Sequence, residues 1–121
     1  MTTKVLIADD EPNIVVSLEF LMKREGYEVI VARDGPAALD AIRRERPALV
    51  LLDVMMPKKS GYEVLAAARA DEDLAGLKVL MLTAKGRDTD VAQGRGVGAD
   101  AYVTKPFSTR DLAARVRELL S

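Results

Sequence analysis

The sequence predicts an α/β fold in which one parallel β-sheet carries helices on both of its faces. Five short apolar segments alternate along the chain with segments of helical periodicity, which is the order expected of successive βα units. The apolar segments are nearly uninterrupted, as is typical of parallel strands that are buried on both faces. The chain has 121 residues and no repeat or linker-like tract, so a single domain over residues 1–121 is expected.

The first strand, helix and second strand occupy the N-terminal quarter of the chain. Residues 4–8 are short and apolar, as in a buried strand. A helix begins near Pro12, since proline suits the first turn, and ends before Gly26, a residue type that often follows the last turn. Residues 27–32 alternate more weakly and indicate a strand near the edge of the sheet.

The middle of the chain contains the most apolar strand. The turn at residues 34–36 leads into a second helix, which Pro47 ends because proline restricts the residue before it. Residues 48–52 follow, and their continuous apolar character predicts the central strand of the sheet. A loop then leads to a third helix over residues 62–70.

The C-terminal part completes the alternation of strands and helices. Strands are expected over residues 78–82 and 100–104, with a helix near 88–95 between them. Three glycines within residues 94–98 weaken the end of that helix, since each costs about 1 kcal/mol relative to alanine in a helix interior. Ser108 is a suitable N-cap for the last helix, whose apolar residues recur on one face.

The composition restricts the possible functions. The 18 basic and 19 acidic side chains leave a formal net charge of −1, which argues against a nucleic-acid-binding surface. The sequence has no cysteine and no histidine, which excludes thiolate and imidazole ligands for a metal. No apolar stretch approaches the roughly 20 residues of a membrane-spanning helix, so a cytoplasmic protein without membrane association is expected.

Four of the predicted strands end at residues that can take part in chemistry. Asp9 and Asp10 follow the first strand, and Asp53 follows the central one. Thr83 and Lys105 follow the last two strands. Because ligands in open α/β sheets bind at the carboxyl ends of the strands, these side chains are expected to meet in one pocket. Each alone has an ordinary explanation as a helix cap, a turn residue or a solvated charge, but their joint occurrence favours a site.

The residue types in this predicted pocket favour magnesium and phosphoryl chemistry. Asp9, Asp10 and Asp53 would repel one another at close range, and a divalent cation removes that conflict. Magnesium prefers hard oxygen ligands and commonly binds phosphate oxygens as well. A carboxylate beside such an ion can attack phosphorus to give an aspartyl phosphate. Lys105 and Thr83 can then hold two of the phosphoryl oxygens.

Short motifs surround these five residues. They are Asp9-Asp10, the segment Leu51-Leu52-Asp53-Val54-Met55-Met56-Pro57, Gly61, Thr83-Ala84 and Lys105-Pro106-Phe107. This pattern resembles the receiver domain of two-component response regulators, and the resemblance covers the whole chain. It implies a flavodoxin-like, doubly wound sheet of five parallel strands in the order 2-1-3-4-5. It further implies a phosphoprotein that catalyses only its own phosphoryl transfer and dephosphorylation, rather than an enzyme acting on other substrates.

The resemblance also implies which phosphodonor and which metal ion this pocket uses. Asp53 would accept a phosphoryl group from the phosphohistidine of a sensor histidine kinase or of a histidine phosphotransfer protein. Mg²⁺ would be the cofactor, bound by Asp10, Asp53 and the backbone carbonyl of Met55. Asp9 would assist through a bound water.

A conformational switch follows from the same resemblance. Thr83 and Lys105 would contact the phosphoryl group, and the peptide bond between Lys105 and Pro106 would be cis. On phosphorylation Thr83 would move toward Asp53, and Tyr102 would turn inward into the space that is left. The fourth helix, fifth strand and fifth helix would form the surface read by a downstream effector protein or a fused output domain.

Three other functions fit the sequence less well. Aspartate-dependent phosphatases place a second aspartate two residues after the nucleophile, where this chain has Met55. A flavin-binding electron carrier of the same fold would need a hydroxyl- and glycine-rich phosphate loop in place of residues 9–11. A degenerate receiver that acts only as a protein-binding module would not need the complete set of pocket residues.

The dimer interface of receivers that drive winged-helix transcription factors is matched only in part. Arg115 lies where one basic residue of that interface is expected. At other positions that are usually charged, this chain has Val91, Gly96 and Ala101. We therefore expect a monomer or a weak dimer that does not use this charged interface.

Overall fold

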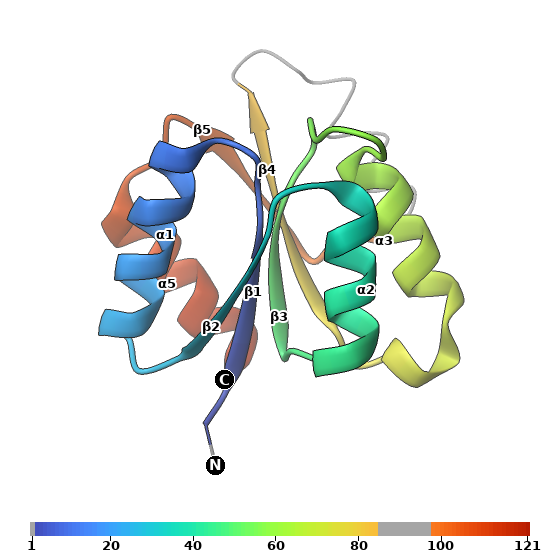
Figure 1. Ribbon diagram of the computed structural model, residues 1–121. Helices are drawn as coiled ribbons and strands as arrows, with labels where there is room; N and C mark the ends of the chain where they lie inside the picture. Colours follow the sequence, from blue (N-terminus) through green and yellow to red (C-terminus); the bar gives the residue numbers. More distant parts are fainter. Residues whose placement is uncertain (1, 85–97) are drawn as a thin grey trace.

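A single parallel sheet of five strands forms the centre of the molecule (Figure 1). The computed structural model describes residues 2–84 and 98–121. The strands are β1 (Lys4–Ala8), β2 (Glu28–Ala32), β3 (Leu49–Asp53), β4 (Lys78–Ala84) and β5 (Ala101–Lys105). They are hydrogen-bonded in the order β2-β1-β3-β4-β5, and every neighbouring pair is parallel. The predicted α/β class, the flavodoxin-like topology and the strand order 2-1-3-4-5 are confirmed.

Helices cover both faces of the sheet. They are α1 (Pro12–Arg24), α2 (Gly35–Glu45), α3 (Gly61–Ala70) and α5 (Thr109–Leu120), with a short 3-10 turn η1 (Glu72–Leu74) after α3. Helices α1 and α5 lie on one face, and α2 and α3 lie on the other (Figure 1). The helix predicted near 88–95 lies outside the described residues. None of the helices in the described ranges is long and apolar enough to cross a membrane.

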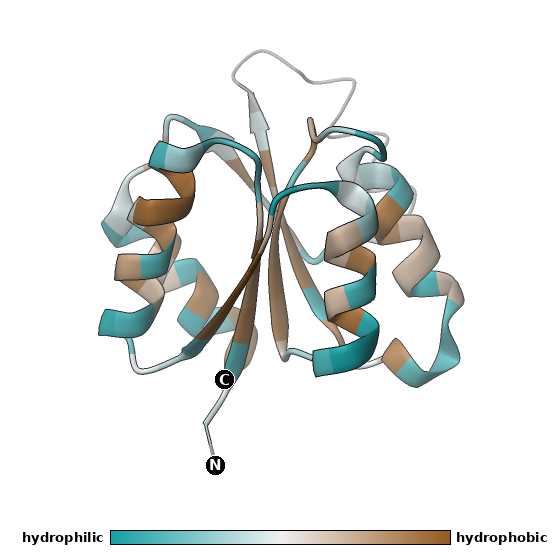
Figure 2. Cartoon of the chain, in the orientation of Figure 1, coloured by the Kyte–Doolittle hydropathy of each residue, from teal (hydrophilic) through white to brown (hydrophobic). Residues whose placement is uncertain are grey.

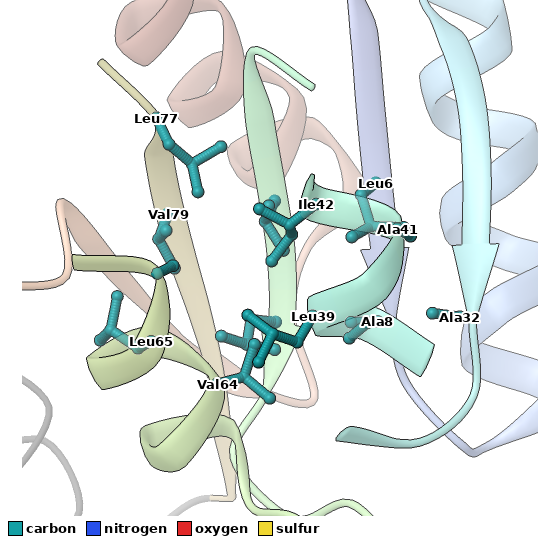
Figure 3. Close-up of a cluster of buried hydrophobic side chains, with 14 of the residues drawn as sticks. Leu6, Ala8, Ala32, Leu39, Ala41, Ile42, Val64, Leu65, Leu77 and Val79 are labelled. Carbon is teal, nitrogen blue, oxygen red and sulfur yellow. The ribbon is translucent and has the colours of Figure 1, made fainter. Parts of the chain in front are cut away.

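The two faces of the sheet bury two separate apolar cores. Alternate residues of a strand point to opposite faces, so Leu6 and Val50 pack under α2 and α3. Their neighbours Ile7 and Leu51 pack under α1 and α5. Figure 2 shows strands that are mostly hydrophobic between helices that mix hydrophobic and hydrophilic residues, and Figure 3 shows the core beneath α2 and α3. This double burial is the reason that the central strands appear as continuous apolar segments in the sequence.

Local sequence signals set several of the helix ends. Gly26 adopts φ 93° directly after the C-cap of α1, as its position predicts. The side chain of Asp34 accepts a hydrogen bond from the Ala37 N–H at 2.8 Å and so caps α2. Ser108 caps α5 in the same way, through the N–H of Asp111 at 3.3 Å.

Three strands, β3, β4 and β5, reach further toward their carboxyl ends than the sequence predicts, and β5 ends at Lys105 rather than at Thr104. Asp53 is the last residue of β3 rather than the first residue after it. Strand β4 continues through Thr83 to Ala84, because both residues pair with β5 in register with Thr104 and Lys105. Asp53, Thr83 and Lys105 are therefore held by the sheet ladder itself rather than by a loop.

Candidate functional site

Two aspartates lie buried at the carboxyl edge of the sheet, at the upper end of the strands in Figure 1. Asp9 directly follows β1, and its backbone N–H donates to the carbonyl of Ala32 at 3.1 Å, which extends the ladder by one residue. Asp53 ends β3. Asp9 is fully buried and Asp53 is only 5% exposed, whereas Asp10 is exposed. Burial of a carboxylate costs free energy unless the charge is compensated. Two buried carboxyl groups at this edge therefore indicate a functional site.

The three aspartates form a set of potential metal ligands. One carboxylate oxygen from each of Asp9, Asp10 and Asp53 lies within 4.8 Å of the other two. Oxygen donors alone, with two carboxylates buried and one open to solvent, suit a hard divalent cation that keeps some of its water, and Mg²⁺ is the common ion of that kind. The donor set therefore fits the magnesium site that the sequence predicts.

Lys105 enters the same pocket from the end of β5. Its Nζ lies 3.0 Å from Asp9 Oδ2 and 3.4 Å from Asp53 Oδ1. Residues that are 96 positions apart in the chain thus form a hydrogen-bonded ion pair. The peptide bond between Lys105 and Pro106 is cis, as the family resemblance implies.

A third carboxylate, from Glu11, also reaches Lys105. Glu11 Oε1 lies 3.5 Å from Nζ, and its side chain is 60% exposed at the mouth of the pocket. The backbone N–H of Glu11 donates to Asp9 Oδ1 at 2.9 Å, so the turn after β1 orients the Asp9 carboxylate. Sequence reasoning assigned no role to Glu11. Its only signal was its position directly after Asp9 and Asp10, at the start of a helix.

The surroundings of Asp53 raise its pKa toward neutrality. Burial raises the pKa of Asp53 to about 6, and the negative charge of Asp9 adds to this rise. Lys105 and the backbone N–H of Met55 act in the opposite direction without cancelling it. Burial lowers the pKa of Lys105, but the hydrogen bond to Asp9 and the surrounding carboxylates outweigh burial and raise that pKa above its usual value. Lys105 is therefore a permanent cation near neutral pH.

The loop between β3 and α3 is fastened close to Asp53. The N–H of Val54 donates to the Leu82 carbonyl at 3.1 Å, and the N–H of Gly61 donates to the Val54 carbonyl at 2.9 Å. A Cβ at Gly61 would overlap the backbone carbonyl oxygen of Asp53. Glycine is thus required sterically at this motif position, because α3 begins in direct contact with the backbone of the central aspartate.

The backbone of Met55, rather than its side chain, contacts Asp53. Its N–H donates to Asp53 Oδ1 at 3.3 Å, which orients that carboxylate. The Met55 side chain is 58% exposed. A backbone role for this residue is consistent with these positions, while the predicted use of its carbonyl as a metal ligand stays a prediction.

The predicted switch residues lie on the two strands beside β3. Thr83 is buried in β4 and follows Leu82, the residue that pairs with Asp53 in the ladder. Tyr102 lies in β5 opposite Met81 and is half-buried, packed against the core beneath α2 and α3. Both side chains are thus near the carboxyl half of the sheet, and their movement on phosphorylation stays a prediction.

Comparison with known families gives a match along nearly the whole chain. A family model described as the response regulator receiver domain matches residues 5–117. Solved structures similar to this chain include a putative response regulator from Chloroflexus aurantiacus, with 33% identity and a TM-score of 0.94 over 99% of this chain and 98% of that one. A CheY-like receiver domain protein from Methanospirillum hungatei has 32% identity and a TM-score of 0.92, over 99% of this chain and 94% of that one.

A third similar structure carries a metal. It is the receiver domain of a sensor histidine kinase from Pseudomonas aeruginosa, with 25% identity and a TM-score of 0.91 over 99% of this chain and 98% of that one. That structure has a magnesium ion coordinated in its active-site cleft.

Proposed function

The chain belongs to the response regulator receiver domain family, and from that premise we propose that it is a phosphorylation-activated switch with Asp53 as the phosphoacceptor. The observation that carries the proposal is the position of the Asp53 carboxylate. It is buried among two further aspartates and lies 3.4 Å from the ammonium group of Lys105. A nucleophile for phosphoryl transfer needs positioning and charge neutralisation above all. Lys105 supplies part of the positive charge, and the aspartates provide oxygen ligands for a cation that would supply the rest.

The reaction transfers a phosphoryl group between two side chains. A carboxylate oxygen of Asp53 attacks the phosphorus of a phosphohistidine on a sensor histidine kinase or a histidine phosphotransfer protein. The P–N bond breaks, its electron pair stays on the imidazole nitrogen, which takes up a proton, and an acyl phosphate forms on Asp53. Lys105 stabilises the charge on a phosphoryl oxygen, and the Thr83 hydroxyl donates to another.

Magnesium fits this scheme as the cofactor. Asp10, Asp53 and the carbonyl of Met55 would hold the ion, with Asp9 acting through a water. When bound, Mg²⁺ supplies positive charge that neutralises the phosphoryl oxygens and lowers the repulsion among the carboxylates. The carboxylate cluster and the magnesium-bound relative support this assignment.

Dephosphorylation and signalling complete the proposed cycle. Water attacks the phosphorus of the acyl phosphate, and its P–O bond to Asp53 breaks to return the carboxylate and inorganic phosphate. The chain thus acts only on itself. While the phosphoryl group is present, Thr83 and Tyr102 shift the population toward an active packing of the face formed by the helix predicted near 88–95, β5 and α5. An effector protein or a fused output domain reads that face in the cytoplasm, with the receiver as a monomer or weak dimer.

The test is incubation with a small phosphodonor such as phosphoramidate in the presence of Mg²⁺, followed by intact-mass measurement. We expect the wild type to gain the mass of one phosphoryl group, and we expect Asp53→Asn to gain none. Asp40→Asn removes an exposed carboxylate on α2 and serves as the matched control; it should behave as the wild type does. No gain on the wild type, or an equal gain on Asp53→Asn, would contradict the proposal.

A further inference from the structure

The loop between β3 and α3 contains a strained turn. The N–H of Lys59 donates to the carbonyl of Pro57 at 2.8 Å, and Lys58 between them has φ 70°. A hydrogen bond between residues two apart, around a residue of positive φ, is the pattern of the rare and strained form of the γ-turn. Lysine gains nothing from a left-handed backbone. Such strain persists where contacts from the surrounding structure hold it, and it is common at ligand-binding sites.

The start of α2, which lies beside this loop at the carboxyl edge of the sheet (Figure 1), supplies contacts that hold the turn. The N–H of Gly35 donates to the same Pro57 carbonyl at 3.3 Å. Gly35 is buried, and a Cβ at this position would overlap the backbone carbonyl oxygen and the Cβ of Lys59. The carboxylate of Asp34 lies 3.5 Å from Lys58 Nζ. Residues 34 and 35 thus approach all three residues of the turn.

The carboxylate of Asp34 also fixes the first turn of α2. Its Oδ1 accepts the N–H of Ala37 at 2.8 Å, while its Oδ2 is the atom that faces Lys58. One side chain therefore caps the helix with one oxygen and meets the loop with the other. An ion pair at 3.5 Å with an exposed lysine contributes little by itself. The helix cap and the close approach at Gly35 are thus the main means by which α2 holds the loop.

The contact between Gly35 and Pro57 restricts the position of the Met55 backbone. The N–H of Val54 donates to a carbonyl of β4 at 3.1 Å, which fixes the start of the loop. Because Pro57 is fixed against α2, only Met55 and Met56 lie between the two fixed points. The side chain of Met55 is largely exposed and does not anchor the segment. The position of the Met55 backbone therefore depends on both anchors.

From this geometry we infer that Asp34 and Gly35 are positioning residues for the magnesium site and act through the loop that carries Met55. The inference rests on the proposed function, in which the Met55 carbonyl is a ligand of Mg²⁺. Neither Asp34 nor Gly35 contributes a ligand in that scheme. Their effect is on the affinity for the ion, because a ligand that is already held in place loses less freedom when the ion binds.

The test is isothermal titration calorimetry of Mg²⁺ into the unphosphorylated protein, which measures the Kd for the ion without phosphoryl transfer. Gly35→Ala should raise this Kd about tenfold or more, because the new Cβ displaces Lys59 and the loop with it. Asp34→Ala removes the helix cap and should raise the Kd severalfold. Asp34→Asn is the conservative variant, since asparagine caps a helix as well as aspartate does. It should stay within about twofold of the wild type.

Two control variants separate this role from a general loss of stability. Gly76→Ala adds the same methyl group where no atom lies within 4 Å. Arg69→Ala removes contacts of α3 at the amino ends of β4 and β5, away from the pocket. Both should bind Mg²⁺ as the wild type does, at a temperature at which circular dichroism shows the variants to be folded.

Three results would overturn the inference. They are an unchanged Kd for Gly35→Ala, equal weakening by Arg69→Ala and Gly35→Ala, and equal weakening by Asp34→Asn and Asp34→Ala. Should Gly35→Ala not fold, the comparison of Asp34→Ala with Asp34→Asn decides the matter. Absence of Mg²⁺ binding by the wild type would contradict the proposed function and this inference together, whereas normal binding by the wild type and by every variant would reject the positioning role alone.

Discussion

The two ends of strands β4 and β5 carry charged clusters of very different composition. At the amino end, Arg69 of α3 makes three short contacts: Nη2 with Asp100 Oδ2 at 2.7 Å, Nη1 with the Leu77 carbonyl at 2.6 Å and Nε with the Gly98 carbonyl at 2.9 Å. Asp100 also accepts the Val79 N–H at 2.8 Å. One cation and one anion are matched, and the three contacts of Arg69 join α3 to residues just before the two strands.

At the carboxyl end, a single cation faces an excess of acid. Lys105 contacts Asp9, Asp53 and Glu11, and Asp10 lies beside them. Four carboxyl groups therefore lie around one ammonium group, and three of them contact it. The amino-end cluster is arranged for stability, because its charges are paired and hydrogen-bonded. The carboxyl-end cluster retains negative charge that only a cation from solution can neutralise, which is the property of a binding site.

The largest effect on stability is expected at the amino end. Arg69→Ala leaves the Asp100 carboxylate and two carbonyls without their partner, and we expect a loss of about 2–4 kcal/mol in the free energy of unfolding. Urea denaturation measures this change. Arg43→Ala, an exposed arginine on α2, should change it by less than about 0.5 kcal/mol. If the loss of unfolding free energy for Arg69→Ala is no larger than that for Arg43→Ala, the contacts of Arg69 with Asp100 and the two carbonyls do not stabilise the sheet.

The next effect concerns the fit of α3 against Asp53. Gly61→Ala forces α3 or the Asp53 carbonyl to move. We expect the free energy of unfolding to fall by about 1–3 kcal/mol and phosphorylation to become slower. Gly76→Ala is the control, because a Cβ at Gly76 meets no atom within 4 Å. If both variants retain stability and phosphorylation, the close contact at Gly61 is not a constraint on the site.

A smaller effect is expected when the pH is changed, because the raised pKa of Asp53 makes the folded protein more stable at lower pH. The pKa of Asp53 in the folded protein, about 6, lies above its unfolded value near 3.8. The folded state therefore binds this proton more tightly, and stability rises as the pH falls through 6. Without Mg²⁺, the wild type should gain about 1.4 kcal/mol relative to Asp53→Asn between about pH 7.5 and about pH 5. Parallel stability curves for the two proteins would refute the raised pKa.

The smallest effect is expected at the mouth of the pocket. Glu11→Gln removes an exposed partner of Lys105 at 3.5 Å, but it also removes repulsion from the neighbouring aspartates. The two contributions oppose each other, and we expect a change in unfolding free energy below about 0.5 kcal/mol. A change larger than about 1 kcal/mol in thermal or urea denaturation would place Glu11 among the essential partners of Lys105.

The sequence predicted the strands well because their burial leaves a direct trace. Continuous apolar segments mark strands that are covered on both faces, so their bounds were found to within one or two residues. The end of β4 was missed for a physical reason. Thr83 is polar and appears to end the apolar segment, yet its backbone still pairs with Thr104. Pairing depends on the neighbouring strand and cannot be inferred from a local pattern.

The site was predictable to the extent that topology alone assembles it. Parallel strands bring Asp9, Asp53 and Lys105 to one edge, whatever the side-chain details. The sequence did not indicate that Asp9 is buried while Asp10 is exposed, because that depends on how the chain turns into α1. Nor did it reveal the contact of Arg69 with Asp100, which joins residues 31 positions apart without a recognisable motif.

The central claim is that the carboxylates at the carboxyl end of the sheet lower the stability of the metal-free protein, because they are held close together to bind a cation beside Asp53. The most direct test is the free energy of unfolding of the wild type and of Asp53→Asn as a function of Mg²⁺ concentration near neutral pH. Without Mg²⁺, Asp53→Asn should be the more stable protein, by up to about 3 kcal/mol. The wild type should then gain about 2.7 kcal/mol when Mg²⁺ reaches a hundred times its Kd, while the variant changes little. A less stable variant without Mg²⁺, or an equal response of the two proteins to Mg²⁺, would contradict the account.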